Sequence, residues 1–409
     1  MLKIKFKMEF FLGVVFLLFS LFPITPNRIK GLPVIILFLT ALYLVSKFNV
    51  YKFKIKKLLF IISPFILIIT SLLYTDNFSN ISRTISTRLS LIIIPISFFL
   101  ISSTNIKLTQ KTISKFHKIY ICSTAIFCLL FFLKITHEGY YSNTININDV
   151  YFIVSNNLFG IGQHPIYGSI FIAIAIFYII QEIKNEKKTF KNILICVGCL
   201  FMLYIFFLLA RKGIIISFIF ALVSVYLIRF KKKSTKKLTI IFIIATFIMS
   251  LSIPVLNKRF KEVFYDFTYQ NINENNSTSI RFGIYECVFK ISQKKWLFGY
   301  GIGDVDDELQ KCYSNKSQIL VKGNFNSHNQ YFSYILSSGI LGAISLVSIL
   351  LTTLFFGYKN RNIIIIFIIL FYSSAFLFEN ILERQSGVIL FMFFISYFNF
   401  IDHQKNLKI

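Results

Sequence analysis

The sequence is poor in charge and poorest in acid. Charged residues make up 15% of its 409 positions, with 17 Asp and Glu against 44 Lys and Arg, while hydrophobic residues make up 56%. A soluble globular protein needs a more polar surface than this composition supplies. The soluble class is therefore excluded, and the sequence predicts an all-α polytopic membrane protein.

Metal-ligating residues are also scarce, with five His and six Cys. Four of the cysteines lie inside apolar runs, where a thiol packs as a small hydrophobic group. Cys287 and Cys312 lie in a polar segment and could pair if it is outside the cytosol, a question that sequence separation leaves open. No spacing typical of a metal site is found, so we expect neither a metal nor a cofactor.

The excess of basic residues gives a net charge of +27. Nucleic-acid binding is one interpretation of such a charge. The lysines, however, stand in short clusters between apolar runs, as in loops that face an anionic membrane surface. We therefore expect membrane lipids as partners and no nucleic acid.

Long apolar runs give the predicted architecture. A membrane span needs about 20 apolar residues, and ten to twelve segments qualify. They lie near 9–25, 31–47, 58–74, 89–104, 114–135, 164–182, 192–210, 213–230, 238–256, 331–356, 363–379 and 386–402. This predicts a transmembrane bundle over 1–256, a large loop over 257–330, and C-terminal helices with a short tail over 331–409.

The basic residues also predict the orientation. With a cytoplasmic N-terminus, the cytoplasmic loops and ends carry about 26 Lys and Arg, against about seven in the short loops on the other side. Both termini are then cytoplasmic, and the 257–330 loop faces the periplasm. The chain is expected in the bacterial inner membrane.

Arg211 and Lys212 break this charge pattern, because they fall between two spans on the outer side. Either the two runs form a tight hairpin or one of them is bent. An arginine at a membrane edge is a functional candidate. The alternative is a side chain that extends to the lipid headgroups. His164, before Pro165, is interpreted as a structural residue at a helix start.

The large loop contains an arginine and a glycine-spaced turn. Apolar residues recur at helical spacing after the stretch Ser277 to Ser279, which predicts an amphipathic helix on the membrane surface with Arg281 in its first turn. Gly299, Gly301 and Gly303 follow. A dinucleotide loop would need a preceding strand, so a tight turn that allows close approach is expected instead.

Two further features stand in this loop. The acidic run Asp304 to Glu308 suits either a divalent ion or a helix start, and we favour the helix start. His328 opens an apolar run where the loop enters the membrane, so its imidazole can act as a base near neutral pH. The alternative is a histidine that caps the helix.

The order of these features resembles the O-antigen ligase and polymerase family. The matching stretches are ARKG at 210–213, WLFGYGIG at 296–303 and SHNQYFSYILSSGILG at 327–342. The resemblance also includes the stretches HPIYGSIF and LFENILERQSGVILFMFF and so covers about residues 160–400. It implies an architecture like that of the GT-C glycosyltransferases.

The resemblance also implies an activity. Such proteins transfer a glycan from undecaprenyl pyrophosphate to an acceptor hydroxyl, such as one on lipid A-core, at the periplasmic face without nucleotide or metal. Arg211 and Arg281 match the pyrophosphate-binding positions, and His328 matches the general base, with inversion at the anomeric carbon. Lys212 departs from the small residue expected there and would add a phosphate contact or extend to the headgroups.

Two alternatives remain beside the ligase. A polymerase of the same family shares these motifs and extends a glycan instead. A polysaccharide or anion transporter would also have about twelve spans, but no repeat relates the halves and the inner spans lack paired carboxylates.

Overall fold

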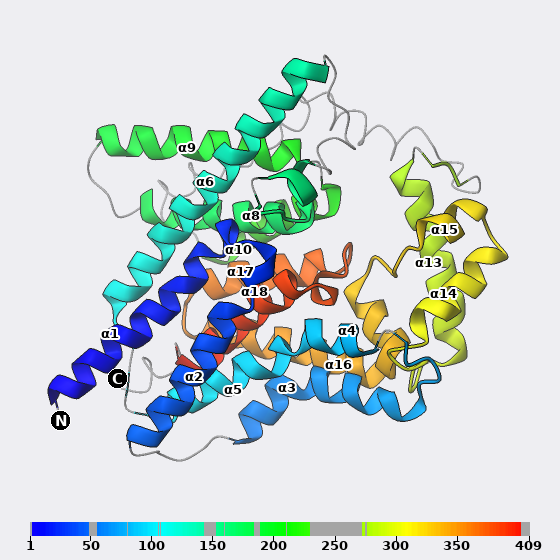
Figure 1. Cartoon of the computed structure of the whole chain (residues 1–409), viewed down its shortest axis with the longest axis horizontal. Helices are drawn as coiled ribbons and strands as arrows, with labels where there is room; N and C mark the ends of the chain where they lie inside the picture. Colours follow the sequence, from blue (N-terminus) through cyan, green and yellow to red (C-terminus); the bar gives the residue numbers. More distant parts are fainter. Residues whose placement is uncertain are drawn as a thin grey trace. The chain divides into compact units, whose positions relative to one another are not determined.

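The computed structural model describes residues 2–48, 55–79, 81–104, 106, 108–142, 153–158, 160–183, 189–209, 211–229, 272–274 and 276–401 (Figure 1). Every regular element within these ranges is a helix. The predicted all-α class is confirmed. The predicted span at 238–256 and the start of the large loop lie outside the described residues.

The chain divides into two compact units. Unit 1 comprises Met1–Tyr51 and Leu100–Asn257, and unit 2 comprises Lys52–Phe99 and Lys258–Ile409. The units group segments that are far apart in sequence, so unit 2 combines an early hairpin with the C-terminal part of the chain. The predicted division into 1–256, 257–330 and 331–409 follows the sequence order and stays a prediction.

Unit 1 is built around one buried helix. Its elements are α1 (Leu2–Leu18), η1 (Phe19–Ile24), η2 (Asn27–Ile29), α2 (Leu32–Lys47), α6 (Gln110–Ser142), η4 (Ile153–Asn157), α8 (Pro165–Ile183), α9 (Thr189–Leu208) and α10 (Lys212–Arg229). Helix α8 packs against α6 and α9. Its residues from Ser169 to Ile176 are fully buried, because the run has almost no polar side chain on any face.

Unit 2 contains two kinds of helix. Its elements are α3 (Ile55–Thr70), η3 (Ser71–Tyr74), α4 (Ile81–Arg88), α5 (Ser90–Ser102, which ends in unit 1), α13 (Ser277–Lys294), α14 (Val305–Ser314), α15 (Gln318–Gly323), α16 (Gln330–Lys359), α17 (Ile363–Ala375), η5 (Ile381–Glu383), α18 (Gln385–Ser396) and η6 (Tyr397–Ile401). The long apolar helix α16 packs on α3 and α17. Helices α13, α14 and α15 pack together, and α13 also contacts α16 (Figure 1).

Six helical segments are long and apolar enough to cross a membrane. They are Asn27–Lys47, Ile55–Tyr74, Ile81–Ser102, Gln110–His137, Pro165–Glu182 and Gln330–Lys359. Five shorter apolar helices, among them those at 195–208 and 385–401, accompany them in the described residues. The protein is therefore of the polytopic membrane class, while the count of ten to twelve spans stays a prediction.

The described part of the large loop is a small helical bundle. Its core is formed by Ile284 and Val288 of α13, Leu309 of α14 and Leu320 of α15. A disulfide joins Cys287 of α13 to Cys312 of α14, two helices that already pack together. The pairing that the sequence left open is therefore present.

Helix α13 begins earlier than the sequence predicted. The Asn276 side chain accepts hydrogen bonds from the backbone of Thr278 and Ser279, so it caps the helix and Ser277 is the first helical residue. Arg281 consequently lies in the second turn, and its predicted place in the first turn is wrong. The polar Ser-Thr-Ser stretch is part of the helix because a capping asparagine precedes it.

The glycine turn packs against a break in α16. Gly299 and Gly301 have φ of 76° and 94°, and Gly339, at the break, has φ of 72°. A Cβ on Gly299 would lie 2.6 Å from the Leu336 carbonyl oxygen, and one on Gly339 would overlap the backbone of Leu297. The backbones therefore approach as closely as only glycine allows.

Candidate active site

His328 stands at the junction between the large loop and α16, in an uncommon backbone conformation. Its φ is 44°, a region that residues other than glycine rarely occupy. The Asn326 side chain accepts a hydrogen bond from the His328 backbone N–H at 3.1 Å. Asn329 caps α16 by accepting from the backbone of Tyr331 and Phe332. The cap is therefore Asn329, which leaves the imidazole available for another role.

The segment around His328 is fixed to the connection between α17 and η5. The Asn329 side-chain amide donates to the Leu377 carbonyl at 3.2 Å, and the Asn380 amide donates to the Ser327 hydroxyl at 3.0 Å. Ser327 is 2% exposed. These contacts flank His328 on both sides and hold its strained backbone, an arrangement that is common at functional sites.

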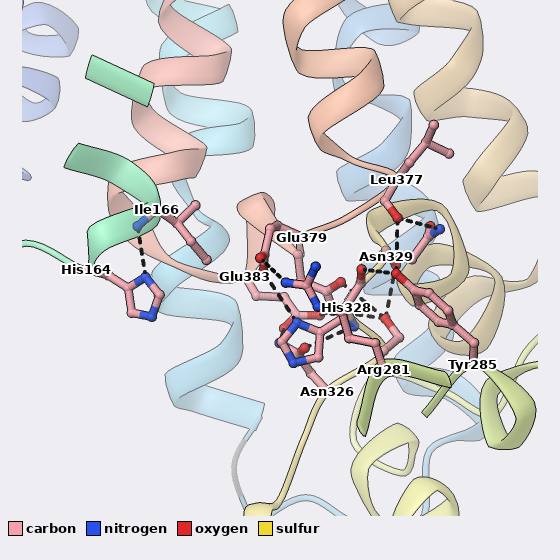
Figure 2. A network of polar contacts seen from close by, with 12 residues as sticks. His164, Ile166, Arg281, Tyr285, Asn326, His328, Asn329, Leu377, Glu379 and Glu383 are labelled. Carbon is pink, nitrogen blue, oxygen red and sulfur yellow. Dashed lines mark hydrogen bonds and ion pairs between the residues drawn. The ribbon is translucent and has the colours of Figure 1, made fainter. Parts of the chain in front are cut away.

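Glu379 connects the two predicted site residues of unit 2. Its Oε1 accepts from Arg281 Nη2 at 2.5 Å, and its Oε2 lies 3.4 Å from His328 Nδ1 (Figure 2). The carboxylate is 5% exposed, whereas the arginine and histidine side chains are each about one quarter exposed. A buried carboxylate thus lies behind two groups that reach the surface.

A second carboxylate, Glu383, lies next to this network. The amide of Asn326 donates to its Oε2 at 2.8 Å, while Ser333 and Asn380 donate to its Oε1 at 2.8 Å and 2.6 Å. Arg88 Nη2, from the end of α4, lies 4.0 Å from the same Oε1. Because Asn326 also accepts from His328, Glu383 supports the loop that carries the histidine.

Tyr285 completes the network from the same helix as Arg281. Its hydroxyl lies 3.2 Å from the His328 carbonyl oxygen and 3.3 Å from that of Leu377, and can donate to either. Burial raises the pKa of Tyr285, with Arg281 lowering it and Glu379 raising it by smaller amounts. The phenol therefore stays protonated at neutral pH and acts as a donor.

The arrangement is suited to proton abstraction next to an anion. If Nδ1 donates its proton to Glu379, the lone pair of His328 is on Nε2, which can accept a proton from a substrate. Arg281 keeps its charge at any physiological pH and presents a fork of donors that matches phosphate oxygens. An imidazole and a guanidinium thus share one orienting carboxylate.

Part of this constellation lies in a segment that is similar to a known protein family. Residues 197–347 match the family described as O-antigen ligase. Residues 197–347 of this chain are therefore similar to the O-antigen ligase family. The matched segment includes Arg211, Lys212, Arg281 and His328, so the resemblance read from the sequence is confirmed there.

A second comparison is with a curated relative. An uncharacterised protein of Haemophilus influenzae is 30% identical over 188 residues, covering 41% of this chain and 47% of that protein. The chain thus matches about half the length of this relative.

The other predicted phosphate ligands of the matched segment, Arg211 and Lys212, lie in unit 1. The helix is interrupted between α9 and α10, and Lys212 is the first residue of α10. The Arg211 carbonyl accepts from Ile215 N at 3.0 Å, so Arg211 caps this helix. Arg281 and His328 belong to unit 2. The predicted convergence of all four residues at one site stays a proposal.

His164 also lies in unit 1 and has the structural role expected of it. Helix α8 begins at Pro165, and His164 Nδ1 accepts from Ile166 N at 3.3 Å. The ring therefore caps the first turn of the helix.

The acidic run forms the start of α14, as favoured from the sequence. Asp306, Asp307 and Glu308 lie in its first turn. Asp304 accepts from the backbone N–H groups of Asp76 and Asn77, at 2.9 Å and 2.7 Å. The run thus joins the glycine turn to the end of α3, and a Cβ on Gly303 would overlap the Asn77 carbonyl.

Sequence reasoning gave no role to Glu379, Glu383 or Arg88. The signal that could have found the two glutamates is their position: they are four residues apart in a short connection between apolar helices, in a chain with only 17 acidic residues. Nothing in the sequence connects Arg88 to them.

Proposed function

We propose that the chain transfers a glycan from undecaprenyl pyrophosphate to an acceptor hydroxyl, without a metal and with inversion at the anomeric carbon. The observation that supports this proposal is the network of His328, Glu379 and Arg281. Two of these residues, Arg281 and His328, lie in the segment that matches the O-antigen ligase family. Lipid A-core is the acceptor for a ligase, and a growing glycan is the acceptor for a polymerase.

The transfer is a displacement at one carbon. The acceptor oxygen forms a bond to the anomeric carbon while the bond from that carbon to the pyrophosphate oxygen breaks. His328 Nε2 takes the acceptor proton, and the electron pair of the broken bond leaves on undecaprenyl pyrophosphate. A positioned base contributes about 10²–10⁴-fold. Glu379 orients the ring and stabilises the imidazolium that forms.

Arg281, Arg211 and Lys212 are the proposed ligands of the pyrophosphate. Charge on the leaving group increases during the reaction, so fixed cations stabilise the transition state more than the ground state. The Glu379 bond to Nη2 of Arg281 fixes the plane of the guanidinium. A planar group held in this way loses less entropy when its other donors bind phosphate.

The proposed site faces the periplasm of the inner membrane, with both termini in the cytoplasm. The Cys287–Cys312 disulfide supports this orientation, because disulfides persist in oxidising compartments and are rare in the cytosol. The bundle that contains it is the same one that contributes Arg281. The excess of basic residues in the predicted cytoplasmic loops agrees with this orientation.

The decisive experiment offers one donor and two acceptors. The purified chain is placed in vesicles with an undecaprenyl-pyrophosphate-linked glycan and either lipid A-core or a second lipid-linked glycan. Release of undecaprenyl pyrophosphate with only the first acceptor indicates a ligase, and release with only the second indicates a polymerase. Movement of glycan across the bilayer without release would instead support a transporter.

A further inference from the structure

A groove in unit 2, away from the His328 network, combines lysines with exposed aromatic side chains. Its volume is about 460 Å³, and it is lined by Tyr74, Lys294, Lys295, Trp296, Leu297, Phe298 and Gly299. None of the network residues described above lines it. The proposed transfer therefore leaves this groove unexplained.

The apolar side chains of the groove are exposed. All six residues from Gln293 to Phe298 are exposed. Trp296 is 56% and Phe298 63% exposed, and Leu73, next to the groove residue Tyr74, is 88% exposed. Such a concentration of large apolar side chains on a surface marks a binding or membrane-contact site.

Hydrogen bonds to the backbone of residues 295–299 fix the turn that carries these exposed side chains. Gly299 N donates to the Lys295 carbonyl at 2.9 Å, and Ile340 N donates to the Trp296 carbonyl at 2.9 Å. The Tyr74 hydroxyl donates to the Phe298 carbonyl at 2.5 Å. The turn is therefore fixed on α16 and on the end of α3, and its exposed side chains are part of a built surface.

The depth of the groove in the membrane can be inferred from the apolar segment that α3 and η3 form. Tyr74 is the last residue of the 20-residue apolar segment Ile55–Tyr74, which is long enough to cross the hydrocarbon core. The end of such a segment lies at the membrane interface, where tyrosine and tryptophan gather. Tyr74 and Trp296 line the same groove, so the groove lies at the interface.

The positive charge of the lysines in the groove favours an anionic ligand. Lys294 and Lys295 lie on its rim, and Lys295 Nζ is 4.9 Å from the centre of the Tyr300 ring. Lysines at a membrane surface attract anionic headgroups, while the aromatic side chains suit acyl chains. We propose that this groove binds an anionic phospholipid, with its headgroup phosphate at the two lysines and its upper acyl chain along Trp296 and Phe298.

The chain has a single tryptophan, Trp296, and it lines the groove. Its fluorescence therefore reports on this site alone. The full chain is placed in vesicles of phosphatidylcholine with a minority of phosphatidylglycerol, and bromine is attached to the acyl chains of one lipid or the other at equal bromine content. Bromine quenches tryptophan on contact, so the ratio of the two quenching efficiencies measures which lipid occupies the groove.

We expect brominated phosphatidylglycerol to quench at least about twofold more than brominated phosphatidylcholine, with the excess falling as salt is raised. Lys294→Ala with Lys295→Ala should bring the ratio close to one. Lys290→Ala, an exposed lysine of the same helix that does not line the groove, should leave it unchanged.

Three outcomes would overturn the proposal. Equal quenching by both lipids in the unmodified chain would mean ordinary contact with bulk lipid. If phosphatidylglycerol still quenches more strongly than phosphatidylcholine in the double lysine variant, the two lysines do not select the anionic lipid. Absence of quenching would mean that the groove faces water. The salt series uses the unmodified chain, so the test remains decisive even if the double variant does not fold.

Discussion

The two units each hold a cation, but with different chemical groups. In unit 1, Lys30 is 1% exposed and donates to the amide oxygens of Asn27, at 2.5 Å, and Gln163. In unit 2, Arg281 is paired with a carboxylate, Glu379. Twelve of the 17 acidic residues of the chain belong to unit 2.

This difference has a functional consequence. An amide oxygen orients a cation without cancelling its charge, whereas a carboxylate both orients and partly neutralises it. Lys30 is almost fully buried, so its pairing serves the packing of unit 1. Unit 2 is suited to holding a base and a phosphate ligand in one geometry. The predictions below test this division of roles.

The largest effect is expected from His328, which stands at the start of a long helix, as His164 does in unit 1. His328→Ala should lower glycan transfer by about 10²–10⁴-fold, because the acceptor then loses its base. The protein should still accumulate in the membrane. The measurement is undecaprenyl pyrophosphate release in vesicles.

The matched control is His164→Ala in unit 1, which removes one hydrogen bond at the start of α8 and should leave transfer near the unmodified level. Full activity of the His328 variant would remove this residue from the mechanism.

A smaller loss is expected when an arginine becomes lysine. Arg281→Lys and Arg211→Lys keep the charge but lose the planar fork, so each should lower transfer by about 10–100-fold. The rates are measured at several donor concentrations. If both lysine variants keep the full rate, the arginines do not bind the pyrophosphate in a bidentate manner.

Glu379→Gln tests the carboxylate itself. The glutamine keeps the shape and a hydrogen bond to His328 but not the charge, so kcat should fall about tenfold. Glu379→Asp should recover part of the loss if charge is what matters. Glu383→Gln is the comparison, since Glu383 contacts the loop and not the imidazole. An equal loss in both glutamine variants would indicate that Glu379 only stabilises the fold.

No effect is expected from removing divalent ions. Transfer should survive strong chelation, because fixed guanidinium groups neutralise the pyrophosphate. The assay is run with and without chelator, followed by magnesium or manganese. Activity that returns with metal, but not in the Asp306→Asn, Asp307→Asn variant, would make the acidic run a metal site.

Parts of the site could be predicted because their signals are local. His328 stands where a polar loop meets an apolar run, and Arg281 stands in a helix whose spacing is visible in the sequence. The boundary of α13 was predicted less well. The residue that caps it, Asn276, is one of several asparagines in a row, and its choice depends on how the helix packs.

The sequence by itself determined the class of the protein. The length of an apolar run fixes whether it can span a bilayer, and the types of side chain at 211, 281 and 328 limit the chemistry. Both properties belong to single segments, so no knowledge of packing is needed.

The tertiary structure alone decided which groups meet. Glu379 is 51 residues from His328 and 98 from Arg281, and it reaches both because α13 and the α17–η5 connection approach the start of α16. The pairing of Cys287 with Cys312 depends in the same way on how α13 packs on α14. Contacts between distant segments are set by the packing of whole helices, which no local pattern records.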